Sequence, residues 1–356
     1  MDKSLLRYFK VYLSVGFVLI FFASYWRMQL LQLSQTSEMQ LTVFKEYGVF
    51  ISLGVSLYIS FLLALFASFS DVFLIRKILH KKSFGFVMLF STVFQLLFII
   101  LIIFITNQLF YFILFNDTVI SYQSIFDAPD VEMLIILAFL AIVISRFILE
   151  VDQKLGKGNL WKFITGKFYS PRTENRIFMF LDLKSSTKIA EKIGHLRFSE
   201  LLQDCFNDLA VVDDYYASVY QYVGDEVVLT WEAKKGIVKD NFINAYFKFI
   251  QKLESKRPFY ELKYGIFPEF KAGAHIGECT VSEIGSLKRE IAYSGDTINT
   301  AARIESMCNK LNADFLISEK LKNHFLTNAQ FNFDEKGCVG LRGKSEKINL
   351  FNVEEI

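Results

Sequence analysis

The chain of 356 residues is long enough for two or three domains. It is 53% hydrophobic and contains 39 phenylalanines, which excludes a soluble globular protein throughout its length. The net charge of +2 identifies no partner by itself, and we expect no binding to nucleic acid. The apolar residues concentrate before residue 150, whereas the composition after about residue 170 is that of an ordinary globular domain.

Four apolar segments, at residues 5–26, 47–75, 86–115 and 131–149, are each about the length that a membrane-spanning helix needs. No small-residue cleavage site follows the first segment, so we interpret it as a retained helix and not as a signal peptide. Residues 1–150 are therefore predicted to form an all-α domain of four transmembrane helices.

Charge in the connecting loops predicts the orientation of these helices. Residues 76–82 carry four basic side chains, the third connection carries only acidic ones, and the segment after the fourth helix is rich in lysine. The positive-inside rule then places both termini in the cytoplasm, as expected for a multi-pass protein of the inner membrane with the lipid bilayer as its partner.

Gln95, Thr106 and Asn107 are the notable polar residues within the spans. We favour hydrogen bonding between helices over a ligand site for them. No ionisable residue is expected at mid-membrane in the second or third segment, so this half is interpreted as an anchor or a sensor without an ion path. Residues 151–172 form a basic linker ending near Pro171, either an arm that transmits a signal or a passive tether.

The cytoplasmic half begins with "RIFMFLD", an apolar run of strand length that ends on Asp182. Ser185, Ser186 and Thr187 follow at the predicted start of a helix. Backbone amides at a helix N-terminus favour anions, so we expect this turn to bind phosphate, with the amide of Lys184 as a further contributor.

A second carboxylate follows in "YVGDEVV", where a glycine separates two runs of β-forming residues. This pattern predicts a hairpin with Asp225 at its tip, and Asp225 meets Asp182 if the hairpin lies beside the first strand. Two carboxylates at a phosphate-binding turn favour hard divalent cations. Glu226 is the next residue along the strand and is expected to point to the other face. His275, on an apolar strand, is interpreted as a packed residue.

The third motif is "SGDTINTAARIE", in which Asn299 and Arg303 are four residues apart and therefore share one face of a helix. An amide and a guanidinium presented together suit a sugar oxygen and a phosphate. The four cysteines all lie in this half without a C-x-x-C pair, and we expect them to be reduced residues of the core.

The motifs "FLDLKSST", "YVGDEVV" and "SGDTINTAARIE", in this order, resemble the class III nucleotidyl cyclase catalytic domain over about residues 176–353. The resemblance implies a ferredoxin-like α/β domain at residues 173–356 that acts as a homodimer, with active sites at the subunit interface. It also implies attack of the ribose 3′ oxygen on the α-phosphate, which yields a 3′,5′-cyclic nucleotide and pyrophosphate. The membrane domain is expected to regulate this reaction.

The resemblance also implies the roles of individual residues. Asp182, Asp225 and the backbone carbonyl of Leu183 would bind two divalent cations, Mg²⁺ or Mn²⁺. Asn299 would orient the ribose and Arg303 would stabilise the transferring phosphate. Lys344, in "LRGKSEKINLFNV", matches the lysine that binds the terminal phosphates.

The two positions that read the base in this family are Gln221 and Ala292, and this pair fits neither the adenylate nor the guanylate pattern. ATP is the expected substrate, with guanylate and pyrimidine nucleotide cyclases as alternatives. A different class of function is a catalytically silent receptor or dimerisation module. The diguanylate cyclases, whose "GGDEF" resembles "VGDEV", are disfavoured because Val223 replaces the first glycine and the family lacks the "NTAAR" helix.

Overall fold

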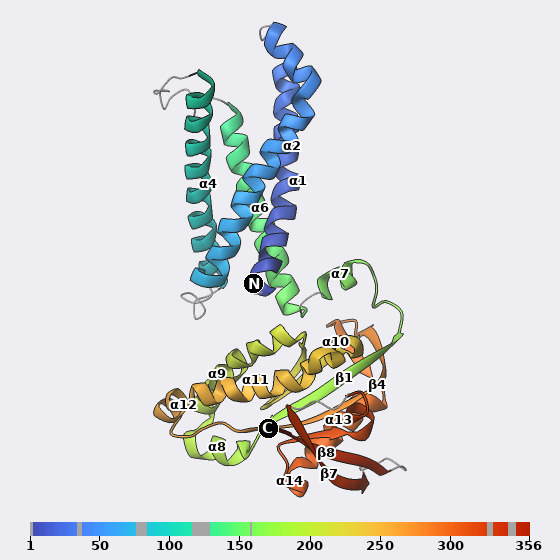
Figure 1. Ribbon diagram of the computed structural model, residues 1–356. Helices are drawn as coiled ribbons and strands as arrows, with labels where there is room; N and C mark the ends of the chain where they lie inside the picture. Colours follow the sequence, from blue (N-terminus) through green and yellow to red (C-terminus); the bar gives the residue numbers. More distant parts are fainter. Residues whose placement is uncertain are drawn as a thin grey trace. The chain divides into compact units, whose positions relative to one another are not determined.

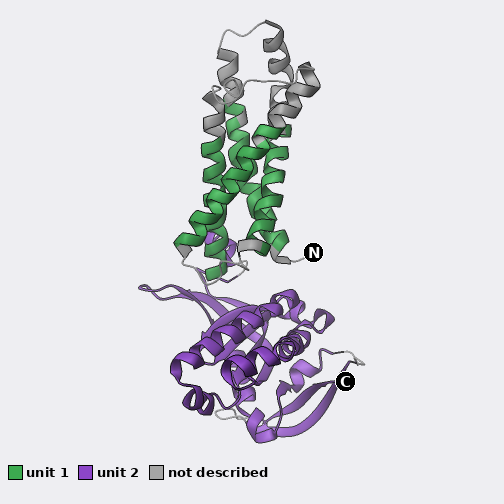
Figure 2. Ribbon diagram, turned by 90° about the vertical axis from the view of Figure 1, so that its left-hand side faces the viewer, with its two compact units in different colours: residues 1–154 green, residues 155–356 purple. Residues whose placement is uncertain are grey.

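A computed structural model describes residues 3–33, 38–75, 84–115, 129–156, 159–325, 330–340 and 347–356. The chain divides into two compact units, Met1–Lys154 and Leu155–Ile356 (Figure 2). The predicted basic loop at 76–82, most of the acidic connection and Lys344 lie outside the described residues, as do the side chains of Thr106 and Asn107.

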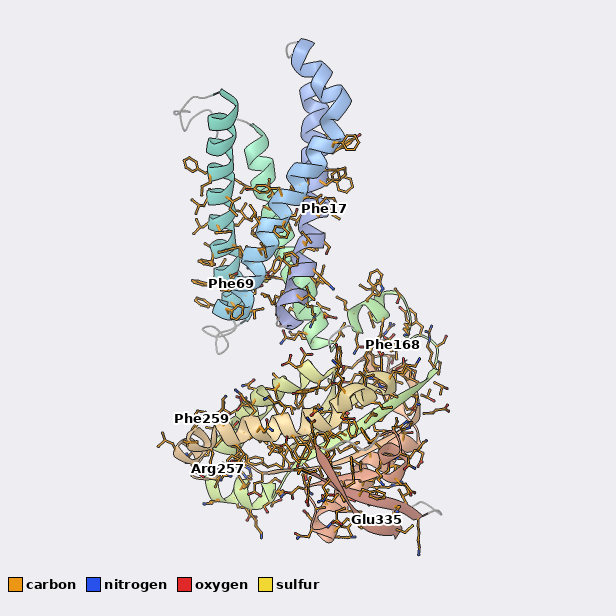
Figure 3. The ribbon with its side chains drawn as sticks, viewed as in Figure 1. Phe17, Phe69, Phe168, Arg257, Phe259 and Glu335 are labelled. Carbon is orange, nitrogen blue, oxygen red and sulfur yellow. The ribbon has the colours of Figure 1, made fainter. Side chains whose placement is uncertain are left out.

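The first unit is a bundle of long helices (Figure 1): α1 (Lys3–Leu33), α2 (Glu38–Phe69), α4 (Phe84–Phe115) and α6 (Pro129–Lys154). Within the described residues, three stretches are long and apolar enough to cross a membrane, namely Leu5–Ala23, Ser56–Phe73 and Gly85–Ile102. Apolar side chains cover the outside of these helices, as at Phe69, which is 58% exposed (Figure 3). The fourth span, predicted within α6, stays a prediction.

Small residues line the contacts between these helices, as is usual where backbones must approach closely without a strong hydrophobic driving force. α1 packs against α2 and α6, while α4 packs against α6 and α2. Ala64, Ala67 and Ala138 are buried in the shared core, and a Cβ added at Gly16 would contact the Ser60 side chain at 3.6 Å. Small side chains therefore set the close spacing of the bundle.

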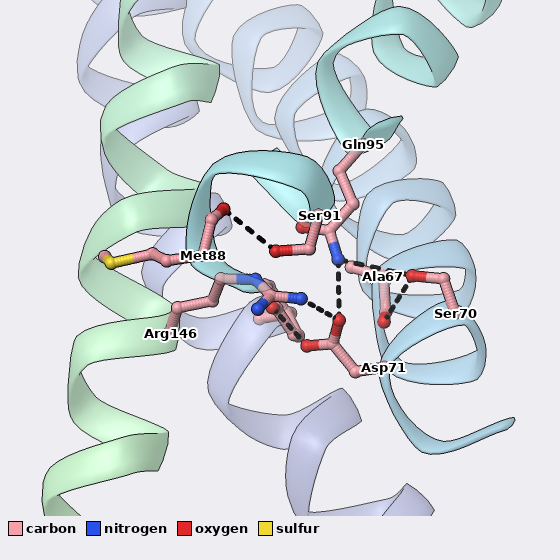
Figure 4. A network of polar contacts seen from close by, with 8 residues as sticks. Ala67, Ser70, Asp71, Met88, Ser91, Gln95 and Arg146 are labelled. Atoms are coloured by element: carbon pink, nitrogen blue, oxygen red, sulfur yellow. Dashed lines mark hydrogen bonds and ion pairs between the residues drawn. The ribbon is translucent and has the colours of Figure 1, made fainter. Parts of the chain in front are cut away.

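A buried ionic network joins four elements of this unit (Figure 4). Asp71 lies on a short π-helical segment, η1 (Ser70–Ile75), which continues from α2, and its side chain is 5% exposed. The Asp71 carboxylate pairs with Arg146 of α6 and accepts hydrogen bonds from Tyr12 of α1 at 2.6 Å and Gln95 of α4 at 3.0 Å. Gln95 thus hydrogen-bonds between helices as expected. The sequence prediction did not name Asp71, although this residue lies within the predicted segment at 47–75.

The second unit is built on one mixed sheet in the order β2-β3-β1-β4-β6-β8-β7, with β5 paired to β4. Its strands are β1 (Arg172–Leu183), β2 (Ser218–Val223), β3 (Glu226–Glu232), β4 (Phe270–Ile284), β5 (Glu290–Ser294), β6 (Phe315–Ser318), β7 (Phe331–Gly340) and β8 (Lys347–Glu355). β4 and β6 are parallel, and the other pairs are antiparallel.

Different helices cover the two faces of the sheet (Figure 1). Because side chains alternate along a strand, neighbouring residues of β1 pack against different helices. Met179 and Leu181 of β1 face the main core, which is covered by α9 (His195–Asp208) and α11 (Asn241–Ser255). Phe178 and Phe180 face the other side, where they pack near α13 (Asp296–Ser306). The shorter helices are α7 (Asn159–Ile164), α8 (Ser186–Ile193), α10 (Ala233–Ile237), α12 (Arg257–Tyr264), α14 (Cys308–Leu311) and α15 (Glu319–Lys322).

The cysteines agree with the sequence prediction at three of four positions. Cys205, Cys279 and Cys308 are free and buried, whereas Cys338 is exposed on β7, so the expectation of a core residue was wrong there. Burial raises the pKa of the Cys205 thiol to about 12, which keeps it protonated and unreactive. His275 is buried with its Nδ1 2.7 Å from Ser318 Oγ, in agreement with a packed histidine.

Candidate active site

Asp182 lies near the end of β1, between two neighbouring strands. Its register partners are Glu226 on β3 and Lys271 on β4. The "YVGDEVV" hairpin therefore lies beside the Asp182 strand, which was the condition for Asp225 to meet Asp182.

Asp225 is held in the tight turn that connects β2 to β3. Val223 pairs with Glu226, so Gly224 and Asp225 alone form the turn, and Gly224 has a φ of +64° that only glycine adopts readily. Because Asp225 directly precedes Glu226, the partner of Asp182, the turn brings the two predicted metal carboxylates together. Asp225 is one of the groups that raise the pKa of Asp182.

Glu226 occupies a different place from the one expected. Residues directly opposite each other in an antiparallel pair project to the same face of the sheet, and Glu226 stands opposite Asp182. Partial burial, together with the nearby Glu305, Asp182 and Asp225, raises its pKa to about 7. The expectation that Glu226 points away was wrong because the turn, and not strand alternation, sets its orientation relative to Asp225.

Lys271 and Glu305 complete this cluster, and the sequence motifs did not predict either role. Lys271 Nζ lies 3.2 Å from Asp182 Oδ2 and 2.8 Å from Glu305 Oε1. Partial burial raises the pKa of Asp182 to about 6, with Glu305 and Asp225 adding to the rise and Lys271 opposing it. The sequence could have indicated the place of Glu305, because it follows Arg303 by two residues and therefore lies on the other side of the same helix.

Helix α13 packs closely on β4 because two glycines of that strand face it. A Cβ at Gly273 would lie 2.1 Å from the backbone nitrogen of Glu305, and one at Gly277 would lie 2.6 Å from Thr297 Oγ1. The helix therefore buries Thr297 and Glu305 against the sheet, while Asn299 is exposed and Arg303 is half-buried. The predicted ribose and phosphate residues lie on the helix face that points away from Asp182 of the same chain.

The turn after Asp182 leads into α8, as the sequence predicted, but its details differ. Ser185 is the N-cap residue with a φ of +56°, and its side chain makes no capping hydrogen bond. The first-turn amides of Ser186 and Thr187 have no partner within the helix and remain suited to an anion. The Lys184 amide instead donates to Glu269 O at 2.8 Å, so the expectation that it contributes to phosphate binding was wrong.

The two predicted base-reading positions lie on β2 and β5. Gln221 is exposed, and its neighbour Tyr220 packs against Tyr293, which follows Ala292. The two tyrosine rings are 5.0 Å apart at their centroids, and the Tyr293 amide donates to the Tyr220 hydroxyl at 3.4 Å. This contact brings the strands that carry Gln221 and Ala292 into one region.

The donor set fits divalent cations. Among the described residues, no group of three or more His, Cys, Asp or Glu side chains is arranged to hold a metal ion. Mg²⁺, however, is usually bound through one or two carboxylates plus substrate phosphates, so a site made of Asp182, Asp225 and the Leu183 carbonyl would need no third protein carboxylate. Burial is the main cause of the raised pKa values of Asp182 and Glu226, and repulsion from the neighbouring carboxylates adds to it. A bound cation would relieve this repulsion.

The model of the adenylate and guanylate cyclase catalytic domain family matches residues 168–354, which is more than half of the chain. The chain belongs to this family. The mixed α/β fold of the second unit is accordingly the class III cyclase fold that the motifs predicted.

Curated cyclases and a solved structure resemble this part of the chain. Adenylate cyclase 2 of Rhizobium meliloti (strain 1021) is 33% identical over 208 residues, which cover 58% of this chain and 57% of that protein. Adenylate cyclase of Anabaena cylindrica is 21% identical over 188 residues, 51% of this chain and 37% of that protein. The chain thus spans about half, or less, of the length of these relatives. A bacterial light-regulated adenylyl cyclase structure shares the fold, with a TM-score of 0.52 at 19% identity over 62% of this chain and 64% of that one.

Proposed function

We propose that the chain is a membrane-bound adenylate cyclase that converts ATP to 3′,5′-cyclic AMP and pyrophosphate at sites shared by two copies. The observation that carries this proposal is the pairing of β1 with β3, which places Asp182 opposite Glu226 and therefore beside Asp225. Carboxylates at that place, followed by the free amides of α8, suit a metal-bound triphosphate.

The direction of Asn299 and Arg303 supports a homodimer. Both residues lie on the outer side of α13, whereas Glu305 and Thr297 face the sheet that carries Asp182. A second copy related by a twofold axis would present its own Asn299 and Arg303 to the carboxylates of the first. Each dimer would then contain two complete sites.

The protein residues act by positioning and by charge. Asp182, Asp225 and the Leu183 carbonyl would hold Mg²⁺ or Mn²⁺, which when bound neutralises triphosphate charge and makes the ribose 3′ hydroxyl more acidic. Asn299 donates to or accepts from the ribose and fixes the 3′ oxygen in line with the α-phosphorus. Arg303 stabilises negative charge on the transferring phosphate, and Lys344 and the amides of Ser186 and Thr187 bind the remaining phosphates.

The substrate assignment to ATP is supported by the two relatives named as adenylate cyclases. Gln221 is exposed on β2, and its amide can both donate to and accept from a base edge. Because Ala292 has no polar side chain, Gln221 is the residue of this pair that hydrogen-bonds to the base and distinguishes it from other bases.

The first experiment supplies ATP, GTP, CTP and UTP separately to the full-length protein in nanodiscs with Mn²⁺, and identifies the products by mass spectrometry. Asp225→Ala is measured in parallel. We expect cyclic AMP from the wild type and none from the variant. Another cyclic nucleotide would overturn the substrate, and no product from any nucleotide would favour the silent receptor.

A mixing experiment tests the shared sites. Asp182→Ala and Asn299→Ala are each expected to be inactive alone. If the copies pair at random, half of the dimers contain one of each chain and each of these has one intact site, so about a quarter of wild-type activity returns. Mixtures that remain inactive, although crosslinking demonstrates mixed dimers, would refute sites drawn from two chains.

The membrane location and the regulation form the second half of the proposal. Three apolar helices support insertion in a bilayer, and their fusion to the cyclase domain suggests that helix movement changes how two catalytic domains face each other. Fusing residues 155–356 to a rigid dimerising helix in successive registers tests this idea. Activity that does not depend on register would refute it.

A further inference from the structure

Lys271 is a buried cation that bridges the carboxylate of Asp182 to helix α13. It lies on β4 directly opposite Asp182 and is 8% exposed. Its ammonium group contacts Asp182 Oδ2 at 3.2 Å and Glu305 Oε1 at 2.8 Å. One lysine thus connects a predicted metal ligand to the helix that carries Asn299 and Arg303.

The residues of this bridge lie on β1, β4 and α13, which are regular elements packed against one another. A buried charge is tolerated when it is paired, and Glu305, itself 7% exposed, supplies one of the two partners. Glu305 reaches Lys271 because Gly273 lets the α13 backbone lie against β4, at a place where any Cβ would come within 2.1 Å of the Glu305 nitrogen. The pair therefore differs from a mobile ion pair at the surface, which contributes little.

We propose that Lys271 is a positioning residue that holds the Asp182 carboxylate of β1 in a fixed position relative to α13, and that it competes with the divalent cation for this carboxylate. This inference rests on the proposed function, because it takes Asp182 as a metal ligand. A cation bound at Asp182 would repel the Lys271 ammonium group, which would then keep only its ion pair with Glu305. Metal loading is thereby linked to the position of α13, and so to Asn299 and Arg303.

The proposal predicts two variants with opposite effects on metal affinity. Lys271→Met removes a positive charge beside Asp182, so Mn²⁺ should bind about tenfold more tightly. Glu305→Gln leaves Lys271 with Asp182 as its remaining charged partner and removes one negative charge from the cluster, so Mn²⁺ should bind about tenfold more weakly. Both variants should turn over at least about tenfold more slowly at saturating Mn²⁺, because α13 loses its anchor.

The test uses the full-length protein and measures Mn²⁺ binding by the loss of the free-ion electron paramagnetic resonance signal, without nucleotide. Lys271→Arg keeps the charge and should bind Mn²⁺ like the wild type. The matched control is Lys256→Met, which breaks a 2.5 Å ion pair with the buried Asp208 on other elements of the same domain. It should lower the unfolding temperature without altering Mn²⁺ affinity.

Opposite shifts in Lys271→Met and Glu305→Gln, with slower turnover and little change in KM, would support the proposal. Unchanged Mn²⁺ affinity in both variants, or a shift in the same direction, would overturn it. If Lys271→Met does not fold, Glu305→Gln and Lys271→Arg still decide between these results. Because the binding readout needs no turnover, a wild-type protein that binds Mn²⁺ but forms no cyclic nucleotide refutes the proposed reaction while the role of Lys271 is still measured.

Discussion

Replacing Gly273 by alanine should push α13 away from the sheet and slow turnover while the protein remains folded. The added Cβ would lie 2.1 Å from the Glu305 nitrogen and 2.4 Å from its Cα, and both are backbone atoms that no side-chain rotation can move. Ordinary van der Waals contact begins at 3.4 Å, so the helix must shift by about 1.3 Å, the difference between 3.4 and 2.1 Å. Overpacking of this kind costs about 1–3 kcal/mol of folding stability.

The same shift displaces Asn299 and Arg303, and a misplacement of about 1 Å can reduce a rate about 100-fold. We expect Gly273→Ala to remain folded, as measured by thermal unfolding, while kcat for cyclic nucleotide formation falls by about that factor. Gly340→Ala is the matched control, because a Cβ there meets nothing within 4 Å. Wild-type kcat in Gly273→Ala would refute the idea that the close approach of α13 positions the catalytic residues.

Three further predictions follow from other parts of the chain. Asp71→Asn should destabilise the first unit by about 3–5 kcal/mol, because it leaves the Arg146 side chain, which is 12% exposed, without its counter-charge. The thermal unfolding temperature in detergent should recover in the double variant Asp71→Leu with Arg146→Leu, and equal unfolding temperatures of the wild type and both variants would contradict this. Glu226→Gln removes a negative charge from the face of Asp182, so the Mn²⁺ concentration for half-maximal activity should rise about threefold, and a fall would indicate that Glu226 does not act on the metal site. Maleimide should label Cys338 in the native protein and the other three cysteines only after unfolding, since burial raises the pKa of Cys205 and Cys308 to about 12 and that of Cys279 to about 11. Mass spectrometry of labelled peptides checks this, and labelling of Cys205 in the native protein would refute its burial.

Local sequence patterns determined most of the candidate site. Asp182 at the end of an apolar run and Asp225 in a glycine turn depend on residues that are neighbours in the chain, so their local structure can be predicted directly. Asn299 and Arg303 share a helix face because they are four residues apart. The division into an apolar half and a globular half can also be predicted, because composition is read along consecutive residues of the chain.

Only the tertiary structure decided how these local elements meet. The register of β1 against β3 and β4 places Glu226 and Lys271 on either side of Asp182, across sequence separations of 44 and 89 residues that no local pattern specifies. Gly273 indicates a close contact only once α13 is seen to lie against it. Asp71 likewise gains its partners from three other helices. Charges buried between distant segments depend on packing and register, and these are properties of the whole fold.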